Sequence, residues 1–107
     1  MATSVNDGSQ TAVISTEHTL DTISASGSFV IGVDTNAMAL GDELILRVKS
    51  KIRSAGTTRT AYQANYIHNQ TIPAKFSIPV VSTNEIVFTL EQVAGTGRAF
   101  LWEIWSL

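Results

Sequence analysis

Apolar and polar residues alternate with period two along most of the chain, which is the pattern of strands whose successive side chains point to opposite faces of a sheet. The clearest example is the segment 43–53, where charged residues occupy one parity. Its other parity is apolar, with Leu44, Leu46, Val48 and Ile52. The same pattern predicts further strands, separated by turn residues, at 11–15, 17–23, 28–34, 57–66, 75–81, 85–93 and 98–107.

The segment 75–81 differs from the other predicted strands because it contains a proline. Phe76, Ile78 and Val80 alternate with the remaining residues, so we expect these three side chains to face the core. Pro79 lies on the opposite parity and has no amide hydrogen to donate to a neighbouring strand. We therefore expect this strand at the edge of a sheet or at a bulge.

Residues 35–40 interrupt the alternation with a short run of helix formers, and Gly41 follows where a left-handed stop is needed. This pattern predicts one short helical turn near residues 35–40, with Met38 and Leu40 closing one end of the core. The segment 95–98 begins like a glycine-rich phosphate loop, but a third glycine is missing and a strand follows. We interpret it as a hairpin turn.

Seven to eight short strands with turns roughly every eight to twelve residues indicate an all-β fold. We expect a single β-sandwich of mostly antiparallel strands, with Greek-key and jelly-roll connections both open. A chain of 107 residues is the size of one domain. The first ten residues are polar and contain the turn pair Asp7-Gly8. We therefore expect a flexible N-terminal arm at 1–10 and the sandwich domain at 11–107.

Charged residues make up 15% of the chain, well below the share of about 25% in ordinary soluble domains. The 11 serines and 13 threonines supply much of the polar surface instead. The absence of cysteine excludes a disulfide framework, a cysteine-ligated metal site and thiol catalysis. The net charge is −2, there is no long apolar run, and the first residues do not resemble a signal peptide. We therefore expect neither bulk nucleic-acid binding nor a membrane span.

Candidate catalytic and metal-binding residues are few. Glu17, His18 and Asp21 are close in sequence, but on a strand Glu17 and His18 face opposite sides, so they do not converge on one metal ion. No serine stands in a G-x-S-x-G context, and Glu85 and Glu91 are predicted as outward residues of one strand. We therefore expect no catalytic residue, no metal and no cofactor, and a protein that is not an enzyme.

Five of the seven basic residues lie within thirteen positions. Four of them, Arg47, Lys49, Lys51 and Arg53, share the outward parity of one strand, and Arg59 is placed to join them across the predicted hairpin. The stripe is expected to be about 20 Å long, because alternate residues of a strand lie roughly 6.6 Å apart. It is either a solvated face whose charges block edge pairing or a contact site for an acidic protein partner. The overall charge disfavours nucleic acid.

The last predicted strand is apolar on both of its parities. One set, Phe100, Trp102 and Ile104, can fill the sandwich. The other set needs cover from outside, and tryptophan is enriched at interface hot spots. A loop or the N-terminal arm of the same chain is one such cover, and a second subunit is the other. The candidate subunit-interface residues are Leu101, Trp105 and Leu107, together with Ile45 and Val87 from the outward parities of their own strands.

Three segments carry a resemblance to a known class of proteins, namely 27–34 (GSFVIGVD), 36–42 (NAMALGD) and 43–48 (ELILRV). Together with the cysteine-free composition rich in serine and threonine, they resemble small β-sandwich virion proteins of tailed bacteriophages over residues 11–107. Within that class, the nearest functional match is the capsid decoration, or cement, proteins. The resemblance transfers no individual site residue to this chain.

The resemblance implies a non-enzymatic structural component of the virion, made in the host cytoplasm and located on the capsid surface. It implies a homo-oligomer, a trimer by preference, that contacts the major capsid protein and uses no nucleic acid, membrane or cofactor. Tail and head-completion proteins have similar sandwiches, so those roles stay open. A further alternative is a small carbohydrate-binding or ligand-binding module that uses Trp105, Tyr62 or Tyr66 as a stacking platform.

Overall fold

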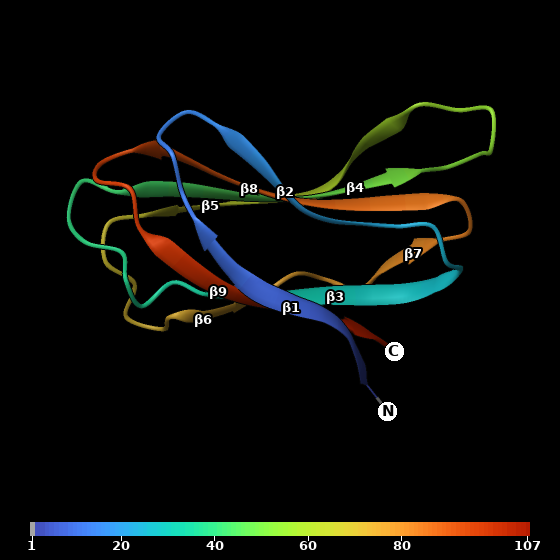
Figure 1. Cartoon of the computed structure of the whole chain (residues 1–107), viewed down its shortest axis with the longest axis horizontal. Coiled ribbons are helices and arrows are strands. Elements are labelled where there is room, and N and C mark those ends of the chain that lie inside the picture. The colour runs from blue at the N-terminus through green and yellow to red at the C-terminus, as the bar shows by residue number, and fades with distance from the viewer. Residues whose placement is uncertain (1) are drawn as a thin grey trace.

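Two antiparallel sheets pack face to face in the computed structural model, which describes residues 2–107 (Figure 1). The expected all-β sandwich is therefore confirmed. None of the described residues is helical, and so none forms a helix that could cross a membrane. The strands are β1 (Thr3–Thr11), β2 (Glu17–Ile23), β3 (Gly27–Asp34), β4 (Glu43–Lys51), β5 (Thr58–Ile67), β6 (Ala74–Phe76), β7 (Val80–Ser82), β8 (Glu85–Ala94) and β9 (Ala99–Ser106).

The first sheet, here called sheet A, has the strand order β1-β9-β3-β6, and β7 also pairs with β3. The second, sheet B, has the order β2-β8-β4-β5. The chain passes from one sheet to the other at almost every connection, and β4 and β5 form the one hairpin among residues 2–107. The turn at 95–98 joins β8 of sheet B to β9 of sheet A, so its interpretation as a hairpin turn was wrong.

The core lies between the sheets and is built from the apolar parity of the four strands at their centres. Three alternate residues of each of these strands are buried, because successive side chains of a strand point to opposite faces. The alternation in the sequence therefore predicted the inner faces of these strands correctly. The residues are Phe29, Ile31 and Val33 of β3, Leu44, Leu46 and Val48 of β4, Ile86, Phe88 and Leu90 of β8, and Phe100, Trp102 and Ile104 of β9.

Two expected core positions are wrong in the segment 75–81, because it is not one strand. Backbone pairing stops between β6 and β7, just before Val80. Phe76 and Ile78 are exposed, whereas Ser77 is buried and its hydroxyl accepts a hydrogen bond of 3.1 Å from the amide of Ile31. Both short strands pair with β3 at the edge of sheet A, as the position of Pro79 predicts.

Residues 35–40 form tight turns and not the predicted helical turn. The amide of Met38 donates to the Thr35 carbonyl at 3.0 Å, and the amide of Asp42 donates to the Ala39 carbonyl at 3.0 Å. The Asp42 carboxylate also accepts a hydrogen bond from the Ala39 amide. This side-chain bond competes with the backbone hydrogen bonds that a helix would form. Met38 is buried as expected, whereas Leu40 is exposed and does not close the end of the core. Ile52 is exposed as well, because it lies past the end of β4.

The segment expected as a flexible arm at 1–10 is a strand for most of its length. Residues 3–11 pair antiparallel with β9, with a register shift between Ser4 and Asn6; Met1 lies outside the described residues. Gly8 stands opposite Trp102, and a Cβ atom at Gly8 would lie 3.0 Å from the indole ring, so glycine serves ring packing here and not a turn. Of the expected strand at 11–15, Thr11 is the last residue of β1, and residues 12–15 belong to the connection from β1 to β2.

Candidate functional site

Arg47, Lys49 and Lys51 lie on the outer face of sheet B, as the alternation predicts, but they do not present free charge. Arg47 is the hub, because its guanidinium lies 2.9 Å from the Glu91 carboxylate and 3.2 Å from the Glu17 carboxylate. Lys49 pairs with Glu17 at 2.9 Å, and Lys51 lies 3.9 Å from Glu85. The three cations of the stripe therefore face three carboxylates, of which Glu85 and Glu91 belong to the adjacent strand β8 and Glu17 to β2 beyond it.

Hydroxyl groups complete this ion-paired network. Thr89 donates to Glu17 at 2.6 Å, and Thr58 donates to Glu85 at 2.5 Å. The Thr89 hydroxyl, with Lys49 and Arg47 beside it, holds the pKa of Glu17 below its ordinary value although partial burial opposes this. The hydrogen bond to Glu91 raises the pKa of Arg47. The outer face of sheet B is therefore a network whose members satisfy one another.

Arg59 does not join the stripe, because β5 contains a bulge. Val48 pairs with Tyr62 but Lys49 pairs with Thr60, so Ala61 is the extra residue. The extra residue reverses the parity of the strand, and Arg59 stands opposite Ser50, which is buried on the inner side. The sequence carries no mark of this bulge.

Arg53 lies beyond the end of β4, in the loop that projects from the sandwich between β4 and β5 (Figure 1), and Arg59 is the second residue of β5, next to that loop. We call residues 52–59 the hairpin tip. Both arginines are exposed, and neither makes a side-chain hydrogen bond or ion pair with any residue in 2–107. The stripe is thus divided into three paired cations on sheet B and two unpaired cations at the hairpin tip.

The outer face of sheet A has the opposite character, because apolar side chains are exposed on it. Trp105 is partly buried and packs against Phe76, with their ring centroids 5.9 Å apart. Leu101, four residues before Trp105 on the same face of β9, is 61% exposed. We call this surface the apolar face; its members are Val30, Phe76, Val81, Leu101, Trp105 and Leu107.

Gly32 lies beneath the aromatic pair at the centre of the apolar face. It stands opposite Phe76 on one side and Glu103 on the other. A Cβ atom at Gly32 would lie 2.9 Å from the Trp105 ring and 3.0 Å from the Phe76 ring, so only glycine lets both rings lie against the backbone. A glycine inside a strand marks such a close approach, and this was the signal available in the sequence.

The aromatic pair separates two shallow depressions in the apolar face. The larger, of about 360 Å³, is lined by Asp34, Leu101 and Glu103 as well as the two rings. The smaller, of about 300 Å³, is lined by Val30 and Leu107 beside the rings. Both lie on the same outer surface of sheet A.

The rim of the apolar face is acidic. Asp7 of β1 stands directly opposite Glu103 of β9, and neither carboxylate has an ion-pair partner within residues 2–107. Among the residues that the structure describes, Asp34 accepts a hydrogen bond only from the amide of Asn36, at 3.0 Å. Lys75 also lines the larger depression, but its ammonium lies over the Tyr66 ring, 5.3 Å from the centroid. The apolar face therefore carries unpaired negative charge at its border.

The five predicted interface residues do not share one surface. Leu101, Trp105 and Leu107 lie on the outer face of sheet A, whereas Ile45 and Val87 lie on the outer face of sheet B, on the other side of the sandwich. Ile45 is only 8% exposed and so presents little to a partner. The alternation identified the outward parity of each strand, but it could not assign the strands to sheets.

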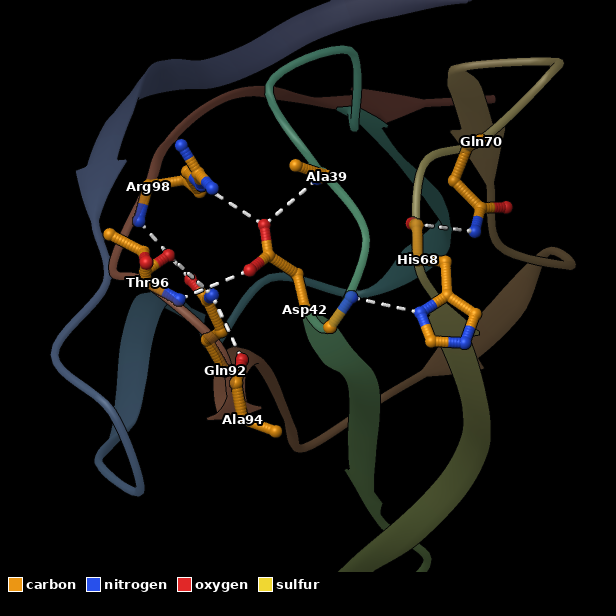
Figure 2. A network of polar contacts seen from close by, with 9 residues as sticks. Ala39, Asp42, His68, Gln70, Gln92, Ala94, Thr96 and Arg98 are labelled. Carbon is orange, nitrogen blue, oxygen red and sulfur yellow. Dashed lines mark hydrogen bonds and ion pairs between the residues drawn. The ribbon is translucent and has the colours of Figure 1, made fainter.

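A buried polar network holds one end of the sandwich together (Figure 2). The Asp42 carboxylate is 1% exposed and accepts bonds from the Ala39 amide at 2.9 Å, the Thr96 amide at 3.1 Å and the Arg98 guanidinium at 3.0 Å. Burial alone would raise the pKa of Asp42, but these three donors together hold it below its ordinary value. Asp42 therefore joins the connection before β4 to the turn before β9.

Gln92 extends the same network from β8. It is fully buried, its amide donates to the carbonyls of Ala94 and Thr96 at 3.1 and 2.7 Å, and its oxygen accepts from the Arg98 amide at 3.1 Å. Gly95 has a φ of +91°, and a Cβ atom there would collide with the Asp42 carboxylate. Gly95 thus makes room for a structural carboxylate, whereas a Cβ atom at Gly97 would collide with the Ala12 carbonyl oxygen.

The two histidines are acceptors for backbone amides. His68 Nδ1 accepts from Gly41 at 2.9 Å (Figure 2), and His18 Nε2 accepts from Val13 at 3.0 Å. Within residues 2–107, no group of three histidine, aspartate or glutamate side chains is placed to hold a metal ion. Both histidines therefore have a structural role in fixing loops.

Comparison of the chain with family models, with curated proteins and with solved structures gives no match. Function has therefore to be inferred from the surfaces themselves. On the outer face of sheet B the three cations are ion-paired, whereas residues 2–107 leave the apolar face of sheet A uncovered.

Proposed function

We propose that this protein is a non-enzymatic structural protein that buries the apolar face of sheet A against other protein subunits. The observation that carries the proposal is the gathering of exposed apolar side chains on one sheet face. Such contiguous patches on soluble proteins mark interaction sites. Burying one exposed leucine side chain contributes about 1.5–3 kcal/mol, so the face can supply a stable contact.

The proposal extends to the setting in which these contacts form. The segments 27–34, 36–42 and 43–48 resemble virion proteins of tailed bacteriophages, and they support a decoration protein that stabilises the capsid. In that role the protein forms a homo-oligomer, by preference a trimer, and contacts the major capsid protein on the capsid surface. Contacts repeated by symmetry stabilise a shell without any single tight site. A tail or head-completion role is the variant of this proposal that uses the same face.

A carbohydrate-binding function is the second candidate, and one observation favours it. The larger depression combines the aromatic pair with the carboxylates of Asp34 and Glu103, groups that stack on sugar rings and accept bonds from hydroxyls. Tyr66 is not part of this platform, because it packs at the core from β5 of the other sheet. Burial, together with the neighbouring Tyr62, raises the pKa of Tyr66 to about 12. Aliphatic residues dominate the rest of the face, which favours a protein partner.

Two matched substitutions test the proposed use of the apolar face. Leu101→Lys places a charge on the outer face of sheet A, and Ile67→Lys places one on the outer face of sheet B. The two residues are 61% and 53% exposed, so neither change disturbs the core. We expect light scattering to give an oligomer for the wild type and for Ile67→Lys, and a monomer for Leu101→Lys. A wild-type chain that stays monomeric at high concentration contradicts the proposal.

The virion setting has its own test. Electron cryomicroscopy of particles that contain this chain is expected to place it on the outside of the capsid. A position along the tail contradicts the decoration role while leaving the structural role intact. A monomer whose tryptophan fluorescence is quenched by oligosaccharides supports the second candidate instead.

A further inference from the structure

Within residues 2–107, the lysine and arginine side chains that have no partner are concentrated at one place. Of the seven lysines and arginines, four take part in ion pairs and Lys75 lies over the Tyr66 ring. The remaining two, Arg53 and Arg59, both belong to the hairpin tip. Between them along the chain lie only small or polar residues, which leaves both guanidinium groups exposed to solvent.

The hairpin tip also carries an apolar side chain that the fold does not use. Ile52 is 81% exposed, although it continues the apolar parity of β4. It lies beyond the end of the strand, so the sandwich offers it no partner. The tip thus combines one exposed aliphatic side chain with two unpaired positive charges.

The apolar face of sheet A has the complementary properties. Its depressions beside Phe76 and Trp105 are open to an aliphatic side chain, and its border carries the unpaired carboxylates of Asp7, Asp34 and Glu103. The hairpin tip of the same molecule extends from sheet B, on the other side of the sandwich (Figure 1). The tip therefore reaches an apolar face only on a second copy.

A contact between two apolar faces is disfavoured by charge. In a two-fold symmetric contact the same surface occurs on both sides, so two surfaces that both carry these carboxylates are brought together. Like charges brought together in this way cost free energy and oppose association. A contact between unlike surfaces brings arginines to carboxylates instead.

We propose that the hairpin tip of one copy docks on the apolar face of sheet A of a second copy. Ile52 enters the depression beside Phe76 and Trp105, and the two arginines pair with the carboxylates of the border. This inference rests on the proposed function, because it names the occupant of the face. Each copy has one tip and one face, so the contact repeats head to tail and closes into a ring where the rotation permits.

Neutralising the tip tests the contact. Arg53→Gln with Arg59→Gln removes two positive charges, and the control Thr19→Glu with Thr22→Glu adds two negative charges at exposed positions of β2. Both variants change the net charge equally. We expect the tip variant to raise the dissociation constant of the oligomer at least tenfold, measured by analytical ultracentrifugation, and the control to assemble like the wild type. Thermal unfolding verifies that both variants are folded.

Charge exchange between two chains makes the test specific. Arg53→Glu with Arg59→Glu disables the tip, and Asp7→Lys with Glu103→Lys disables the border. Each variant alone is expected to be monomeric. Mixed in equal amounts they are expected to assemble, because each then offers the surface that the other needs.

The outcomes separate this inference from the proposed function. If the tip variants assemble like the wild type while Leu101→Lys is monomeric, tip docking is wrong and the apolar face remains the assembly surface. If Leu101→Lys also assembles like the wild type, the proposed use of the face fails as well. A mixture of the two charge-exchange variants that stays monomeric overturns tip docking.

Discussion

The outer faces of the two sheets differ in what they expose to solvent: sheet B exposes ion-paired charges, and sheet A exposes apolar side chains. Sheet B places Arg47, Lys49 and Lys51 among glutamates, and every cation of that face has a partner. Sheet A places leucines and an aromatic pair outward, and the carboxylates at their border have no ion-pair partner within residues 2–107. The charged cluster that stands out in the sequence is therefore the inert face. The surface suited to a partner is the one whose groups are left unsatisfied.

Removing Asp42 is expected to have the largest effect, because both sheets depend on it. Asp42→Ala leaves the Arg98 guanidinium and two backbone amides without their acceptor at the crossing between the sheets. We expect the free energy of unfolding to fall by about 3 kcal/mol, measured by urea titration. The control Asp34→Ala removes an acceptor of one exposed bond and is expected to cost less than about 1 kcal/mol. Equal losses in the two variants contradict the structural role of Asp42.

Removing the hub of sheet B is expected to have the next largest effect. Arg47→Met leaves the carboxylates of Glu17 and Glu91, which stand opposite each other, without the cation between them. We expect a loss of about 1–2 kcal/mol of stability that added salt reduces, because salt screens the repulsion. Association through sheet A is expected to be unchanged. Arg53→Met is the control for stability, since Arg53 has no partner among residues 2–107.

Changing Gly32 is expected to alter sheet A with little effect on stability. The added Cβ of Gly32→Ala pushes the rings of Trp105 and Phe76 off the backbone, and both are surface side chains that can move. We expect the free energy of unfolding to change by less than about 1 kcal/mol, because alanine also restricts the backbone of the unfolded chain and so offsets part of the cost. The oligomer is expected to weaken, and the tryptophan emission to shift. Ser28→Ala, on the same face of β3, is the control, and unchanged association in Gly32→Ala argues against the aromatic pair as a contact.

The smallest expected effect concerns acid sensitivity, which sheet B confers through Glu17. Because the pKa of Glu17 is lowered from 4.5 in the folded protein, its stabilisation is fully present above about pH 4.5 and is lost as the pH falls through the folded value. The pKa of Asp42 is lowered from 3.8, so its contribution to stability is likewise lost as the pH falls below about 3.8. We expect Glu17→Gln to lose a few tenths of a kcal/mol at pH 7 and to show a shallower acid dependence in urea titrations. If the free energy of unfolding of Glu17→Gln falls with decreasing pH as steeply as that of the wild type, Glu17 does not confer the acid sensitivity.

The sequence predicted those parts of the fold that are decided within one strand. Leu44, Leu46 and Val48 alternate without interruption, and burial follows the alternation. Phe76 was misplaced because the strand breaks before Pro79, and Arg59 because a bulge at Ala61 reverses the parity. β1 was not predicted as a strand because its residues show no alternation of apolar and polar side chains. It is a mostly exposed edge strand that is held by its backbone pairing with β9.

The candidate site was predictable to the same extent. Two apolar parities on the last strand identified Leu101 and Trp105 as outward residues in need of cover. Ile45 and Val87 were grouped with them because parity tells which way a side chain points relative to its own sheet. Which sheet a strand joins is decided by pairing between distant segments, and single-strand patterns contain no record of it. The acidic border depends on the same pairing, since Asp7 and Glu103 become neighbours only through β1 and β9.

The position of β9 between β1 and β3 governs the order in which the molecule can be made. β9 follows both neighbours in the chain, and its pairing brings Thr3 opposite Ser106. Closing so long a loop is slow compared with forming the β4–β5 hairpin, so sheet A is completed after the local parts of sheet B. Leu101 and Trp105 arrive on that same strand. We therefore expect a folding chain to acquire its apolar face later than the β4–β5 hairpin, at the step that also brings Phe100, Trp102 and Ile104 into the core.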